Sequence, residues 1–188
     1  MALAPGWETA AGAAAKWCGD GVAPTETGCT FPRIFASSSQ STTANTPQNA
    51  FDGATTTGVG WVSAALPSVA APQILGVQFA VPVIINQVSL FGRLNGNRAY
   101  NPSDYTIETS DTGADGSWTA QATLSSAAPA TTWPITTAKT DAIVTSFAPP
   151  LVATWIRVNI TQTYFMYAGV PQVPPTANST QICELQIR

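Results

Sequence analysis

Few residues of this 188-residue chain could do polar or covalent chemistry: three cysteines, ten acidic residues, seven basic residues and no histidine. The absence of histidine excludes a Ser-His-Asp or Cys-His nucleophile, an HExxH metalloprotease and any His-containing zinc or copper site. No pair of carboxylates has a spacing that indicates a glycosidase. We therefore expect a binding or structural protein that is not an enzyme.

The cysteines and the charges narrow the classes of ligand further. Cys18, Cys29 and Cys183 include no CxxC pair, which argues against a metal knuckle. Two alternatives remain: three buried or isolated thiols, or a Cys18–Cys29 bridge that closes a Gly/Pro/Thr-rich loop. The formal net charge is -3, and the seven basic residues are scattered. Such a chain cannot neutralise a nucleic-acid backbone, so nucleic acid is excluded as a partner.

The apolar content predicts a folded chain outside the membrane. Hydrophobic residues make up 45% of the sequence and include six Trp, while charged residues make up only 9%. Disordered chains usually show the opposite balance. The amino end lacks the basic start and apolar core of a secretory signal. No apolar run approaches the roughly 18 residues of a membrane span, and we expect no membrane partner.

Short runs with a period of two, separated by turn residues, begin near Ile34 and predict an all-β sandwich or barrel. The run 73–79 places Leu75, Val77 and Phe79 on one face, and the runs 154–160 and 182–188 alternate in the same way. Residues 1–32 have no sustained period and are predicted to form an irregular N-terminal arm, with at most one helical turn at 11–17. Residues 33–188 are predicted to form the β-sandwich domain.

Three long connections interrupt the predicted strands, over 37–63, 125–143 and 163–180. Long loops in a compact domain are often functional. The third carries Tyr164, Phe165, Met166 and Tyr167 in succession. These residues are either buried against the arm or form a recognition surface.

Five segments in a fixed order resemble the discoidin, or coagulation-factor C-type, family of galactose-binding-like domains. They are the opening Ala36-Ser37-Ser38-Ser39 with Pro47-Gln48-Asn49-Ala50-Phe51-Asp52-Gly53 and Trp61, then 73–79, 101–111, 153–158 and 183–187. The resemblance covers roughly residues 34–188. It implies an antiparallel jelly-roll β-sandwich of about eight strands, with neighbouring termini and binding loops at one end.

The resemblance also implies a structural calcium ion near the Asp-Gly turn. Carboxylates would come from Asp52 and Glu184, a hydroxyl and a carbonyl from Thr57, and backbone carbonyls from Asn49, Ala54 and Cys183. All-oxygen ligand sets of six or more suit this hard cation. Alternatively, Asp52-Gly53 is only a turn and Glu184 only an outward-facing residue.

Sugar-binding relatives resemble the chain around residues 90–98. The resemblance implies that Arg93 and Asn95 or Asn97 hydrogen-bond sugar hydroxyls, because guanidinium and amide groups match vicinal hydroxyls. Tyr164 or Tyr167 would stack on the ring, and Trp61 is a weaker candidate because it matches the family's core Trp. The family's usual histidine has no counterpart, which argues against galactose-type recognition. Alternatively, Asn95-Gly96 is a turn and the arginines are solvated loop charges.

The sequence thus favours a non-catalytic surface protein, a virion-surface decoration or adhesion protein built on a carbohydrate-binding-type domain. Neighbouring subunits would bind through residues 1–32, and a glycan or cell-surface ligand would be the other partner. The alternative is a stand-alone carbohydrate-binding module or lectin of a secreted or cell-surface protein. Either role places the chain on a virion surface or outside the cell.

Overall fold

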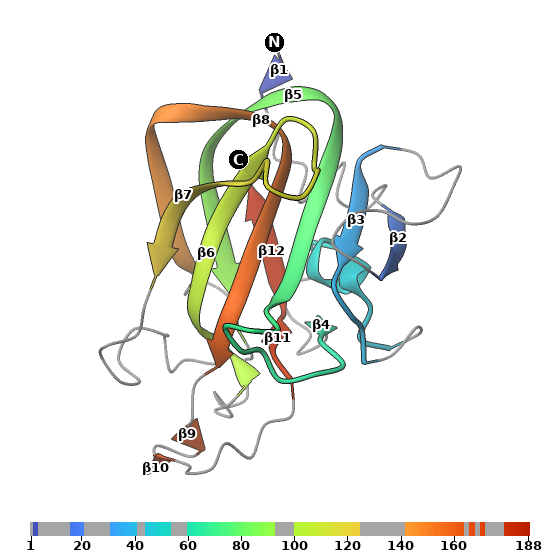
Figure 1. Cartoon of the computed structure of the whole chain (residues 1–188), viewed down its shortest axis with the longest axis vertical. Coiled ribbons are helices and arrows are strands. Elements are labelled where there is room, and N and C mark those ends of the chain that lie inside the picture. The colour runs from blue at the N-terminus through green and yellow to red at the C-terminus, as the bar shows by residue number, and fades with distance from the viewer. Residues whose placement is uncertain are drawn as a thin grey trace.

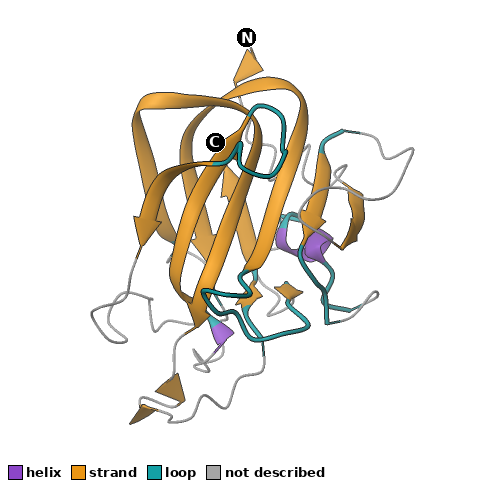
Figure 2. Cartoon of the chain, in the orientation of Figure 1, coloured by secondary structure: helices purple, strands orange, loops and turns teal. Residues whose placement is uncertain are grey.

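The described part of the chain consists mostly of β-strands, with a short 3-10 helix, η2 (Pro47–Ala50), at one side (Figures 1 and 2). The computed structural model describes residues 2–3, 16–20, 31–40, 44–53, 60–92, 100–124, 142–163, 166–167, 170–171 and 179–188. The strands are β1 (Ala2–Leu3), β2 (Lys16–Asp20), β3 (Arg33–Ala36), β4 (Trp61–Val62), β5 (Gln73–Phe91), β6 (Pro102–Ser110), β7 (Thr119–Leu124), β8 (Ile143–Thr163), β9 (Met166–Tyr167), β10 (Val170–Pro171), β11 (Gln181–Ile182) and β12 (Glu184–Ile187). No helix in these ranges is long and apolar enough to cross a membrane.

The main sheet has eight strands, and its longest path runs β2-β3-β5-β8-β6-β7. All pairs along this path are antiparallel except β2 with β3. The parallel strand β1 and the antiparallel strand β12 also pair with β5. The predicted antiparallel jelly-roll sandwich is thereby confirmed.

Two long strands, β5 and β8, turn the sheet into a sandwich. The first half of β5 pairs with β3, and its second half pairs with β12, while β8 follows it through both halves. The β5–β8 register shifts between Gln78 and Val83, next to Pro82. Proline is tolerated there because a bulged bend needs no ladder N–H at that position. Each strand therefore bends from one layer into the other, as the green and orange ribbons in Figure 1 show.

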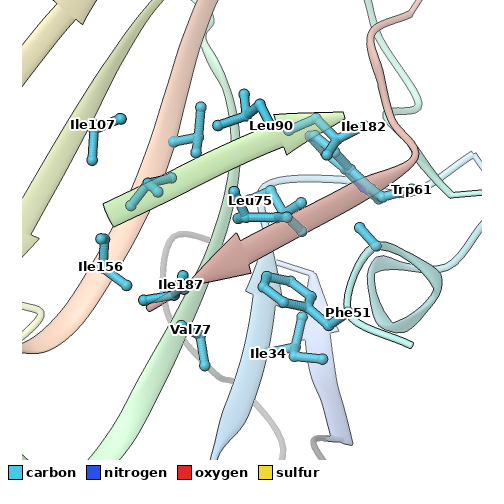
Figure 3. Close-up of a cluster of buried hydrophobic side chains, with 14 of the residues drawn as sticks. Ile34, Phe51, Trp61, Leu75, Val77, Leu90, Ile107, Ile156, Ile182 and Ile187 are labelled. Carbon is cyan, nitrogen blue, oxygen red and sulfur yellow. The ribbon is translucent and has the colours of Figure 1, made fainter. Parts of the chain in front are cut away.

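The core lies between the two layers and follows the predicted alternation. Leu75, Val77 and Phe79 are buried, as are Ile156, Val158 and Ile160. Side chains from β3, η2, β4 and β12 close the same cluster, which Figure 3 shows around Leu75, Leu90 and Phe51. Every residue from Gln181 to Ile187 is buried, because β12 and its approach are covered on both faces.

A second, smaller cluster lies on the outer face of the main sheet. Phe35, Ile74 and Trp155 are buried there, and Trp118 packs against them. The guanidinium carbon of Arg157 lies 3.9 Å from the centre of the Trp118 ring, while its Nε donates to Glu108 Oε2 at 2.6 Å. The β6–β7 turn folds over this cluster, because Gly113 has a φ of 73° and a Cβ there would meet the Trp155 ring.

Residues 1–32 differ from the predicted arm where the structure describes them. β1 and β2 are strands of the main sheet, so Lys16 and Trp17 belong to a strand and not to a helical turn. Residues 4–15 and 21–30 lie outside the described ranges, and the boundary at residue 33 stays a prediction. β1 pairs with Val83–Ile84, and the Arg188 carbonyl accepts hydrogen bonds from the Asn86 and Gln87 N–H groups. The two ends of the chain therefore lie close together on β5, as predicted.

Candidate functional site

The segment with the predicted sugar contacts leaves and re-enters the sandwich at one place. Its flanking residues are Phe91 and Gly92 at the end of β5 and Tyr100 and Asn101 before β6. Gly92 lies directly against Asn101, since a Cβ on Gly92 would fall 2.6–2.8 Å from three atoms of the Asn101 amide. Asn101 is buried. The two stems of residues 93–99 therefore touch, and only glycine fits at position 92.

The predicted sugar ligands themselves, Arg93, Asn95 and Asn97, lie outside the described residues. The segment that carries them leaves the sandwich at the stem formed by Gly92 and Asn101. This stem is at the lower end of the sandwich in Figure 1, beside β4 and β11 and opposite β1.

The aromatic segment leaves the sandwich at the same end. Thr163, the last residue of β8, pairs with Pro102, which follows the stem of residues 93–99. Tyr164 lies outside the described residues, and Tyr167 belongs to β9, which pairs with β10. Backbone topology thus brings the start of the segment that carries both tyrosines next to the stem of the Arg93 segment.

Trp61 is a core residue. Its side chain is fully buried, and its Nε1–H donates to the Ser38 carbonyl at 2.9 Å. Figure 3 shows it among the packed apolar side chains of the sandwich. The suggestion that Trp61 stacks on a sugar is therefore wrong, because the ring presents no face to solvent. Trp61 lies in the core, the position expected from its match to the family's core Trp.

The residues expected at a calcium site come from two parts of the chain that meet. η2, which contains Asn49, packs against β12, which begins at Glu184, and Asp52 follows η2 by two residues. Gly60, which follows the segment containing Ala54 and Thr57, lies directly against the backbone of Ile182 and Cys183. Ala54 and Thr57 lie outside the described residues.

The surroundings of these residues suit an oxygen-binding cation. Glu184 is fully buried, whereas Asp52 is exposed. Burying an ionised carboxylate is costly unless a cation or hydrogen bonds compensate it. The Asn49 Nδ2 donates to the Ala44 carbonyl, leaving the Asn49 backbone carbonyl as its ligand atom in the expected set. Within the described ranges, no three His, Cys, Asp or Glu side chains gather as a metal cluster. A hard cation here would therefore depend on carbonyl and hydroxyl ligands as well.

The end of the sandwich that contains the stem of residues 93–99 and the last residue of β8 is called the loop end below. Two buried hydroxyls at this end were not singled out from the sequence. The side-chain oxygens of Ser103 and Thr163 are buried and make no hydrogen bond. Thr163 is the partner of Pro102 in the β6–β8 ladder, and Ser103 follows Pro102, so both hydroxyls belong to the ends of β6 and β8 next to the two loop segments. Nothing in the local sequence distinguishes them from other strand hydroxyls, because their burial follows from how β6 and β8 meet.

The profile of the F5/8 type C domain family matches residues 34–171, nearly three-quarters of the sequence. The chain belongs to this family. The closing strand β12 lies beyond the matched range but completes the same core. No curated protein sequence matches this chain closely enough to establish a relationship.

Solved structures similar to this chain include carbohydrate-binding modules. Chitosan-binding module 1 of a chitosanase/glucanase from Paenibacillus sp. IK-5 is 21% identical, with a TM-score of 0.57, over 84% of this chain and 94% of the module. The family 32 module of NanJ from C. perfringens, in complex with galactose, is 18% identical with a TM-score of 0.56, over 82% and 90%. Chitosan-binding module 2 of the Paenibacillus enzyme, in complex with chitotriose, is 16% identical with a TM-score of 0.53, over 83% and 95%. At these identities the likeness establishes the galactose-binding-like β-sandwich fold.

Proposed function

We propose that this protein is a non-catalytic carbohydrate-binding module that acts outside the cell. The observation that carries the proposal is the convergence of an Arg/Asn-rich segment and a Tyr-rich segment on one end of an F5/8 type C sandwich. Proteins with the same fold, which cover 82–84% of this chain, are carbohydrate-binding modules by name. This support favours a carbohydrate-binding module over the virion-surface role that the sequence first indicated.

The proposed ligand contacts divide between polar and apolar faces of a sugar. Arg93 would donate from its guanidinium to vicinal hydroxyls, and Asn95 or Asn97 would both donate and accept. Tyr164 or Tyr167 would cover the C–H face of the ring. The chain has no histidine, so the proposed site lacks the family's usual histidine, and we propose a ligand other than simple galactose.

Titration with galactose and with chitotriose, followed by tryptophan fluorescence and calorimetry, tests this function. We expect chitotriose to bind and Arg93→Ala to weaken binding at least tenfold, since hydrogen bonds to a charged group contribute about 1.5–3 kcal/mol. Arg188→Ala is the matched control, because Arg188 lies at the opposite end of the sandwich, where its carbonyl contacts β5. Absence of binding across both sugars and a wider glycan array would refute the function.

A calcium ion is proposed at Asn49, Asp52, Ala54, Thr57, Cys183 and Glu184. Support comes from the packing of η2 on β12 and from the burial of Glu184. A calcium ion would compensate the buried carboxylate and tie the Asp52 turn to the closing strand. Its role would be structural.

A second candidate function is assembly with neighbouring subunits through residues 1–32. It is favoured by an apolar surface at the end of the sandwich opposite the proposed sugar site. The bends 80–82 and 148–150 are exposed, Val81 is 56% exposed and Val152 is 47% exposed. No charged residue occurs in 79–85 or 146–153, and β1 pairs with β5 beside them. Exposed apolar patches commonly mark contact surfaces.

As an adhesion or virion-surface protein, the chain would use this end for assembly and the loop end for attachment. Mass measurement in solution tests the assembly. We expect an oligomer that dissociates when Val81 and Val152 are both replaced by Ser. A monomeric wild-type chain would contradict it.

A further inference from the structure

Thr180 lies at the junction of three chain segments, close to the loop end and entirely inside the protein. Its side chain is fully buried. Its Oγ1 donates to the Tyr100 carbonyl at 3.1 Å, and its N–H donates to Ser63 Oγ at 2.8 Å. In return, the Ser63 N–H donates to the Thr180 carbonyl at 2.9 Å. One residue therefore holds two other parts of the chain by three hydrogen bonds.

Each of the two residues that Thr180 contacts lies just after a chain segment that leaves the sandwich at the loop end. Tyr100 closes the 93–99 segment, and Ser63 follows β4 and hence the 54–59 segment. Thr180 itself follows the 172–178 segment. The neighbouring strands extend this junction, because β11 pairs with β4 and the Cys183 N–H donates to the Phe91 carbonyl at 2.9 Å. Both stems of residues 93–99 are thus held by the stretch 180–183.

The hydroxyl of Thr180 has a particular part in this junction. β-Strand pairing already joins β4 and β11, but the contact with the Tyr100 carbonyl depends on a side chain. Tyr100 precedes Asn101, whose amide lies against Gly92. A shift at Tyr100 would therefore change both ends of the segment that carries Arg93, Asn95 and Asn97.

We propose that Thr180, held by Ser63, is a positioning residue that fixes the Tyr100 side of the stem of residues 93–99 and thereby sets the affinity of the loop end for its ligand. The second half of this statement rests on the proposed carbohydrate-binding function. Because Thr180 is fully buried, it acts through the main chain of Tyr100 and touches no ligand. The chemistry of the contact is a neutral hydroxyl-to-carbonyl hydrogen bond, which is insensitive to pH in the physiological range.

The test compares Thr180→Val, which keeps the shape and removes the hydroxyl, with Thr180→Ser, which restores it. Thr161→Val is the matched control, since Thr161 Oγ1 donates to the Asp104 carbonyl at 3.2 Å in the ladder between β8 and β6. Hydrogen exchange of peptides covering 93–101 measures how firmly this stretch is held, and titration with chitotriose measures affinity. We expect Thr180→Val to raise exchange in 93–101 and to weaken chitotriose binding by about five- to tenfold, the effect of losing one hydrogen bond. Thr180→Ser should recover most of both, and Thr161→Val should change neither.

The two readouts separate the positioning role from the proposed function. Exchange in 93–101 that is the same for Thr180→Val and Thr161→Val overturns the positioning role, and so does unchanged chitotriose affinity in Thr180→Val when the wild type binds. Failure of the wild type to bind any sugar overturns the proposed function, while the exchange data still decide the positioning role. Should Thr180→Val fail to fold, Ser63→Ala removes the acceptor of the Thr180 N–H and is judged by the same exchange criterion.

Discussion

The ion pair between Arg157 and Glu108 should stabilise the sandwich by an amount that a double-mutant cycle can measure. The Arg157 Nε lies 2.6 Å from Glu108 Oε2, and the two side chains are only 12% and 14% exposed. Asn159 Nδ2 donates to the other Glu108 oxygen at 3.1 Å, and Arg157 covers the Trp118 ring. The perturbations are Glu108→Gln and Arg157→Met, alone and together.

The expected magnitudes follow from these contacts. A hydrogen bond to a charged partner contributes about 1.5–3 kcal/mol, and the partial exposure of both groups places Glu108→Gln near 1.5–2 kcal/mol. Arg157→Met should cost more, about 2–3 kcal/mol, because it also removes the cation–π contact with Trp118 and leaves the Glu108 carboxylate half-buried. Either change alone already breaks the charge pair. The double variant should therefore lose about 1.5 kcal/mol less free energy of unfolding than the sum of the losses of the two single variants.

Urea unfolding at neutral pH, followed by tryptophan fluorescence, supplies the four free energies of unfolding. The coupling should change little between about 0.1 and about 1 M salt, because a half-buried pair is screened less than a solvated one. A coupling energy below about 0.3 kcal/mol, the limit of simple additivity, would refute the reasoning. It would mean that the pair behaves as an ordinary surface contact.

Three further changes test the core and the proposed cation. Gly76→Ala should destabilise the protein by about 1–3 kcal/mol, because the added Cβ would lie 2.5 Å from Phe35 Cζ and 2.7 Å from the Ile156 carbonyl oxygen. Urea unfolding of the variant and the wild type measures this loss. Trp61→Phe should lose about 1–3 kcal/mol by leaving the Ser38 carbonyl without its donor, and an unchanged unfolding midpoint would contradict the assigned hydrogen bond. Added calcium should raise the melting temperature of the EDTA-treated wild type and leave that of Glu184→Gln unchanged, whereas an equal response of both proteins would rule out this carboxylate as a ligand.

The all-β class and most inward-facing residues could be predicted from the sequence, because side-chain direction along a strand alternates locally. Leu75, Val77, Ile156 and Val158 are buried for this reason. The continuity of β5 through Pro82 could not be predicted, because the runs 73–79 and 84–90 look separate along the chain. They join only because β8 bends with β5 and keeps the pairing on both sides of the corner.

For the candidate site residues, too, the sequence predicted some positions and left others to the tertiary structure. The resemblance predicts that Asn49, Asp52 and Glu184 lie together. η2, which contains Asn49, packs on β12, and the cation site itself stays a prediction. Trp61 was ambiguous between a stacking surface and the core, since an aromatic ring suits both. Its complete burial settles the matter and depends on strands and a helix from distant parts of the chain.

The sequence alone determined the all-β class and the absence of histidine chemistry, because these depend on short-range periodicity and residue types, while the two segments that could recognise a sugar came from the resemblance to a known family. The tertiary structure decided which polar groups meet. Glu108 and Arg157 are 49 residues apart, and Ser63 and Thr180 are 117 residues apart. No local pattern encodes such contacts, because they exist only when strand order and register bring the two positions together across the sandwich.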